Sequence, residues 1–110
     1  MSKFTDAIAE KAEETYSIAK SKGWWDSPRE DGTMIALMHS ELSETLEALR
    51  HDNPKSDKIP DFTGAEEEIA DVIIRAFDWC RHKGFRLGGA IEAKMEFNRG
   101  REFKHGGKAF

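Results

Sequence analysis

The sequence lacks several features that mark common classes of protein. Its 110 residues include a single cysteine, Cys80, which excludes an intramolecular disulfide and a Cys-x-x-Cys metal site. We expect this thiol to be a small buried apolar group. No apolar run approaches the roughly 18 residues of a transmembrane helix, and the N-terminal residues hold no apolar signal-peptide core. We therefore expect a cytoplasmic protein without a membrane partner.

The sequence also lacks a net positive charge and has few apolar residues. The net charge is −4, so the chain as a whole lacks the basic character of nucleic-acid-binding domains, and we expect no nucleic-acid partner. Hydrophobic residues make up 38% and charged residues 35% of the sequence, against typical values of about 45–50% and about 25%. We predict a single domain over residues 1–110, whose small core is completed in a homodimer or homotetramer.

Helical periodicity covers most of the chain, and no segment shows the period of two that marks a β-strand. The predicted helices span about 3–22, 33–51, 63–83 and 89–99. Gly23 and Gly84 follow two of them as expected C-terminal caps. Thr63 and Glu66 match a capping box at the start of the third. The sequence therefore predicts an all-α fold, a helical bundle of four to five helices.

Apolar residues recur along one face of the second and third predicted helices. The second helix carries Ile35, Met38, Leu42, Leu46 and Leu49. The third carries Ile69, Val72, Ile73, Ala76, Phe77 and Cys80, with Ile74 and Trp79 off that stripe. Because its apolar residues cover two sides, we expect the third helix to be the central member of the bundle.

Acidic residues form two pairs with a spacing of three, one on each of these helices. Glu41 and Glu44 make the first pair, and Glu68 and Asp71 make the second. Like charges at this spacing lie side by side and repel by a few tenths of a kcal/mol. Glu47 is an alternative partner for Glu44, but it points farther from the apolar flank and is expected to face solvent. If the two helices pack antiparallel, the four paired carboxylates meet in a partly enclosed space.

A divalent cation explains why four carboxylates would be gathered in this way. Without a cation they would repel one another and their pKa values would rise. Mg²⁺ takes carboxylate oxygens and waters and is commonly shared with substrate phosphates, whereas an all-oxygen ligand set disfavours zinc and copper. The pattern ExxE, 23 residues, ExxD thus predicts a Mg²⁺ site, with Mn²⁺ as the other candidate ion. The competing interpretation is a solvated acidic helix surface.

These motifs resemble those of a known family, the MazG-like proteins among the all-α nucleoside triphosphate pyrophosphohydrolases. The stretches "SELSETLEALR" and "EEEIADVIIRAFDWCRHKG" look like its two core helices, and "IEAKMEFNRGREFKHGGK" is similar to its closing segment. The resemblance covers about residues 23–108. It implies helical dimers or tetramers whose four-helix bundles are completed across subunits.

The resemblance also implies an activity and the residues that perform it. An NTP or dNTP would be hydrolysed to the nucleoside monophosphate and pyrophosphate, in a role of clearing or balancing nucleotides. The catalytic and metal-binding residues would be Glu41, Glu44, Glu68 and Asp71. Glu41 or Glu44 would act on the attacking water. Phosphate contacts are implied at Lys94 and Asn98, four residues apart on one helix face, with Arg101 continuing that face.

Other residues leave alternatives open. Trp24 and Trp25 form either a hydrophobic latch or a platform on which a nucleobase stacks, for which we favour Trp25. Arg75 either reaches a phosphate or neutralises the acids. The last residues, about 101–110, are either a flexible tail or, through their glycines and lysines, a segment that approaches the triphosphate.

Three other functions compete with this interpretation. Phosphoribosyl-ATP pyrophosphohydrolase shares the implied fold. A ferritin-like di-iron protein would use Glu-x-x-His motifs from two helices, but the sequence has only one, Glu102 to His105. A non-enzymatic helical interaction module would use the apolar stripes to bind a partner.

Overall fold

Residues 2–101 are described by a computed structural model, and within that range the chain is all-α. Its four helices are α1 (Lys3–Ser21), α2 (Asp31–Arg50), α3 (Gly64–Lys83) and α4 (Leu87–Arg99). The prediction of an all-α fold is confirmed, with helix boundaries within about two residues of those expected. No helix in the described range is both long and apolar enough to cross a bilayer. The predicted tail lies outside this range, except for Arg101.

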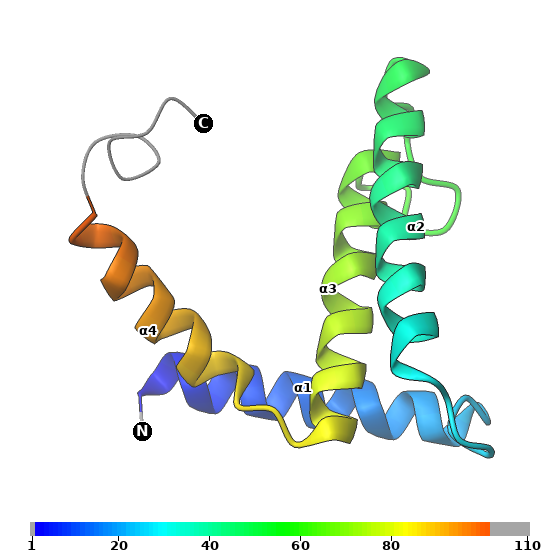
Figure 1. The fold of residues 1–110 in the computed structure, drawn as a ribbon. Helices are drawn as coiled ribbons and strands as arrows, with labels where there is room; N and C mark the ends of the chain where they lie inside the picture. The colour runs from blue at the N-terminus through cyan, green and yellow to red at the C-terminus, as the bar shows by residue number, and fades with distance from the viewer. Residues whose placement is uncertain (1, 102–110) are drawn as a thin grey trace.

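The four helices form an antiparallel pair and two further helices at its base. Figure 1 shows α2 and α3 standing side by side, α1 lying across the base of this pair, and α4 leaning away from it. Helix α3 packs against both α2 and α1, while α4 packs against α1. The third helix is therefore the central one, as its two-sided apolar pattern predicts.

The ends of α3 follow from local chemistry. The Thr63 hydroxyl accepts a hydrogen bond from the Glu66 backbone N–H at 3.3 Å, and the Glu66 carboxylate accepts one from the Thr63 N–H at 3.0 Å. This is the predicted capping box, and it satisfies two of the amides left unpaired at a helix start. At the other end, Gly84 has a φ of 75°, a left-handed conformation that glycine adopts without steric cost.

The core of a single chain is small. Among the described residues, the buried apolar side chains are Ala12, Met34 and Cys80, so the expected burial of Cys80 is confirmed. The radius of gyration is 16.5 Å, whereas a compact domain of this length has about 13 Å. One chain alone is thus more open than an ordinary globular domain.

Much of the predicted apolar stripes of α2 and α3 is exposed in one chain. Seven large apolar side chains on these two helices are exposed, and all but Ile74 lie on the predicted stripes. We call these six the apolar face: Ile35, Leu42, Leu46, Leu49, Ile69 and Ile73. Leu46, for example, keeps 49% of its surface accessible. At about 100° per residue, the paired acids of α2 and α3 project well away from these stripes. In one chain, each helix therefore presents much of its apolar stripe to solvent and directs its paired acids to a different side.

Removing the capping box should weaken the fold measurably. We expect Thr63→Ala to lower the free energy of unfolding by about 1 kcal/mol, because the Glu66 amide at the start of α3 loses the hydroxyl that accepts its hydrogen bond. Urea unfolding followed by circular dichroism would measure this. Thr33→Ala, an exposed threonine within α2, is the matched control and should change stability by less than about 0.5 kcal/mol. Equal effects of the two substitutions would contradict the capping role.

Candidate functional site

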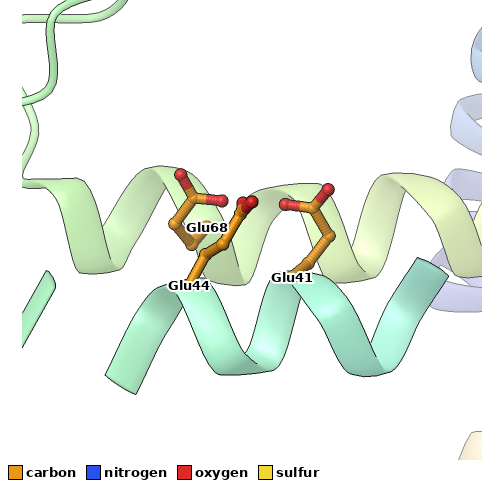
Figure 2. Close-up of side chains that lie close together, drawn as sticks. All are labelled: Glu41, Glu44 and Glu68. Carbon is orange, nitrogen blue, oxygen red and sulfur yellow. The ribbon is translucent and has the colours of Figure 1, made fainter. Parts of the chain in front are cut away.

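Carboxylates from α2 and α3 meet between the two helices. Oxygens of Glu41, Glu44 and Glu68 lie within 4.8 Å of one another, and Figure 2 shows the three side chains directed into a common space. Oxygens of Glu67, Glu68 and Asp71 satisfy the same distance limit, so Glu68 belongs to both groups. The antiparallel pair thus gathers all four predicted acids around one place, and adds Glu67.

Two oxygens in this cluster lack partners. Glu41 is only 8% exposed. Among the described residues, Oε2 of Glu41 and Oε2 of Glu68 are buried without any hydrogen bond. A buried carboxylate oxygen without a partner is costly, and native proteins rarely keep one without a reason such as a bound ion or proton. These oxygens and the neighbouring Glu44 fit the hard oxygen ligands of Mg²⁺.

Arg75 and the close packing of the acids set the charges of the cluster. Arg75 Nε donates to Oε1 of Glu41 at 3.1 Å, and its terminal nitrogen lies 3.1 Å from the same oxygen. Burial, together with the Glu41 and Glu44 carboxylates, raises the pKa of Glu68 to about 8. Burial alone would raise the pKa of Glu41 too, but the net shift is downward because Glu68 and Arg75 stabilise its charged form. Burial and the charge of Glu41 raise the pKa of Asp71.

The acidic cluster opens into a cavity of about 590 Å³, within the roughly 300–1,000 Å³ of typical small-molecule sites. The cavity follows α3 from Glu67 to Asp78, about 16 Å at 1.5 Å per residue. At its other end it reaches Ile18 and Trp24, at and just beyond the C-terminal part of α1. The clustered carboxylates therefore line one end, while an aromatic ring, an aliphatic side chain and the single carboxylate of Asp78 line the other.

Four cationic residues also line this cavity: Lys22, Arg29, Lys58 and Arg75. Lys58 lies on the loop between α2 and α3, and its Nζ is 4.0 Å from Oε2 of Glu67. Of the four, the sequence singled out only Arg75. Lys58 was not predicted. The sequence feature that could have indicated it is the length of the 51–63 loop, because loops of a dozen residues are often functional.

Hydrogen bonds hold the 51–63 loop in place. Ser56, which is buried, donates through its hydroxyl to Glu67 and accepts from the Ile59 N–H at 3.1 Å. Its backbone N–H donates to the Phe62 carbonyl at 2.9 Å, and the Asn53 side chain accepts from the Ala65 N–H at 2.9 Å. These bonds tie both ends of the loop to the start of α3, and so position Lys58.

Three predicted phosphate-binding residues lie elsewhere in one chain. Lys94 and Asn98 are exposed on α4, Arg101 follows that helix, and none of the three is among the residues lining the cavity. The ammonium group of Lys94 lies 4.6 Å from the ring centroid of Phe97 instead. The spacing of four residues puts Lys94 and Asn98 on one face of α4. However, α4 packs on α1, away from the acidic cluster.

The two tryptophans have different positions. Trp24 lines the cavity and is 56% exposed. Trp25, which the sequence favoured as the stacking platform, is not among the lining residues. Its ring is stacked on that of His82, with centroids 3.9 Å apart, and its Nε1–H donates to Asp78. Trp24 is therefore the residue whose ring is available to a ligand, and the sequence did not single out Asp78.

No protein family, curated protein or solved structure matches the chain. Membership of the MazG-like family therefore stays a prediction that rests on the sequence motifs.

The raised pKa of Glu68 predicts how stability depends on pH without metal. Its pKa is about 8 in the folded chain, against an ordinary value of 4.5. Between these values the folded state binds more protons than the unfolded state, so the free energy of unfolding should fall as the pH rises from about 5 to 8. Glu68→Gln should reduce this fall, since the amide does not titrate. Urea unfolding in chelator at several pH values would measure it.

Glu10→Gln, at an exposed position on α1, is the control for this experiment and should leave the pH dependence unchanged. A Glu68→Gln variant with the same pH dependence as the unaltered chain would show that Glu68 titrates normally.

Proposed function

We propose that this chain is a Mg²⁺-dependent nucleoside triphosphate pyrophosphohydrolase of the MazG-like type, converting NTP or dNTP and water to the monophosphate and pyrophosphate. One observation carries the proposal. Two buried oxygens without partners, from Glu41 and Glu68, lie beside Glu44 in a cavity that also contains lysine and arginine side chains. A cavity of this composition suits a cation and a polyanion bound together.

The acids account for the metal. Glu41, Glu44, Glu68 and Asp71 would hold Mg²⁺, with Mn²⁺ as the other candidate. When bound, the ion supplies electrostatic stabilisation of the charge on the phosphoryl oxygens. Without it, a triphosphate would be repelled by the carboxylates that line this end of the cavity.

The remaining roles fall to this chain's own side chains. Arg75 and Lys58 line the cavity next to the acids and would hold phosphate oxygens. Positioning and electrostatic stabilisation of this kind are most of what phosphoryl transfer requires of a protein. Glu41 is already bound to Arg75, whereas Glu44 is exposed and also lines the cavity. Of the two candidates, Glu44 is therefore better placed to orient the attacking water.

The apolar face supports a homo-oligomer, a dimer or a tetramer. The six large apolar side chains of this face are exposed in one chain, and burying such side chains in an interface is favourable by roughly 25 cal/mol per Å². Packing two α2–α3 pairs against each other would give a four-helix bundle and enlarge the core. A single chain's small core and large radius of gyration favour the same conclusion.

Loss of a proposed ligand should abolish activity. We expect Glu41→Gln or Asp71→Asn to lower the rate of pyrophosphate release from dNTPs by more than about 100-fold, because mutating even the partners of metal ligands costs about 10–100-fold. Both variants should fold, because Asp71→Asn removes a negative charge from the acidic cluster and, in Glu41→Gln, the amide oxygen can still accept from Arg75. Glu47→Gln, on the same helix but paired with His51 at the surface, is the control and should retain full activity.

Near-normal rates in both ligand variants would overturn the assignment of the site. Thermal unfolding separates the enzyme from a non-enzymatic interaction module. Mg²⁺ with a nucleotide should raise the melting temperature through binding to the folded state, and an unchanged melting temperature would favour the module.

The oligomer can be tested with one substitution in the apolar face. Leu46→Glu would bury a charge in the proposed interface, so we expect the molar mass from light scattering to fall to that of one chain. Met95→Glu, at an exposed apolar residue of α4 outside the apolar face, should leave the mass unchanged. A monomeric unaltered chain, or a Leu46→Glu variant of unchanged mass, would contradict the proposal.

A further inference from the structure

The end of the cavity remote from the acidic cluster contains a buried polar group of its own. Asp78 lines the cavity and is only 7% exposed. It follows Asp71 by seven residues on α3, which is about 10 Å along the helix axis. Burial raises the pKa of the Asp78 carboxyl. The proposed metal site does not include this side chain, which lies about three turns of helix beyond Glu68.

One oxygen of Asp78 has a fixed partner and the other has none. Trp25 Nε1–H donates to Oδ1 of Asp78 at 2.8 Å, while Oδ2 has no hydrogen bond among residues 2–101. Trp25 is itself held by stacking on His82, whose Nδ1 lies 2.9 Å from the Tyr16 hydroxyl. Because this chain of contacts fixes Oδ1 on Trp25, Oδ2 is the oxygen that remains available to a ligand in the cavity.

Flat and apolar groups line the cavity with Asp78. The Trp24 ring is more than half exposed, and Ile18 and Ile74 line the same cavity. The Arg29 guanidinium lies 5.3 Å from the centroid of the Trp24 ring, a distance at which it is attracted to the ring face. An aromatic face with apolar neighbours and one oriented acceptor is the composition of a site for a planar heterocycle.

We propose that Trp24, Ile18, Ile74 and Asp78 form a nucleobase pocket, and that Asp78 selects bases carrying an exocyclic amino group over those with a keto oxygen in its place. An amino group of cytosine or adenine projects from the ring and can donate to Oδ2. Uracil and thymine instead offer one N–H between two carbonyl oxygens. In the same position, a carbonyl oxygen of these bases would lie against the Asp78 carboxyl group. The inference rests on the proposed function, because a triphosphate bound at the acidic cluster would place the base in this pocket.

The test compares dCTP with dUTP, which differ in an amino group against a keto oxygen and in the hydrogen on the adjoining ring nitrogen. We expect the unaltered protein to hydrolyse dCTP with a kcat/KM about tenfold or more above that for dUTP, since each such hydrogen bond contributes roughly a factor of ten. In Asp78→Asn, the amide oxygen must still accept from Trp25, so the amide nitrogen becomes the group facing the cavity. A donor there suits the keto oxygen, and the preference should reverse.

Asp6→Asn, an exposed aspartate on α1, is the matched control and should keep the preference for dCTP. A purely structural role for Asp78 would lower kcat/KM for both nucleotides alike and leave their ratio unchanged, which would overturn the inference. Calorimetric titration of the unaltered protein with dCMP and dUMP needs no variant and no turnover, and equal affinities would also overturn it.

Failure of this inference is distinct from failure of the proposed function. If dCTP and dUTP are hydrolysed at equal rates and Glu41→Gln abolishes both reactions, base selection by Asp78 is wrong while the proposed pyrophosphohydrolase activity stands. Absence of pyrophosphate release from every nucleotide tested would overturn the proposed function and this inference with it.

Discussion

Repulsion among the carboxylates of Glu41, Glu44 and Glu68 is the constraint on which the rest of the structure depends. Three oxygens within 4.8 Å of one another cannot all carry charge without compensation. Arg75 compensates one of them, and the raised pKa of Glu68 keeps a proton on another at neutral pH. Because the core of one chain is small, little packing energy is available to oppose that repulsion. A bound cation would relieve it.

The helices α2 and α3 are amphipathic in an unusual sense, because their acids meet in the cavity while much of their apolar stripes is exposed in one chain. Both features have the same origin, the approximately 100° rotation between successive helical residues. Once the acids of α2 and α3 meet in one cavity, Leu46 and its neighbours must point elsewhere. The proposed metal site and the proposed oligomer interface are therefore linked by the geometry of this pair of helices, and rotating a helix to alter one would also alter the other.

Sequence reasoning predicted what local rules decide. The four helices and the capping box at Thr63 follow from periodicity and capping chemistry, whereas the meeting of Glu41 with Glu68 was predicted only on the condition that the two helices pack antiparallel. It did not predict contacts that depend on how helices dock, such as the bond from Trp25 to Asp78, because residues 53 positions apart leave no local signal. For the same reason Lys94 and Asn98 share a helix face as expected, yet the packing of α4 on α1 keeps them from the cavity of their own chain.

Glu68, Asp71 and Asp78 all lie on α3, and this has a consequence for what the cavity can accept. A continuous helix does not lengthen or bend easily, so the separation between Asp71 and Asp78 is set by covalent geometry and cannot adapt to the ligand. If the cavity binds a nucleoside triphosphate as proposed, nucleotides with fewer phosphates would fill only one end at a time. Inserting a single residue between these positions would turn Asp78 by about 100° and move it by about 1.5 Å, whereas a full extra turn would approximately restore its direction and demand a longer molecule.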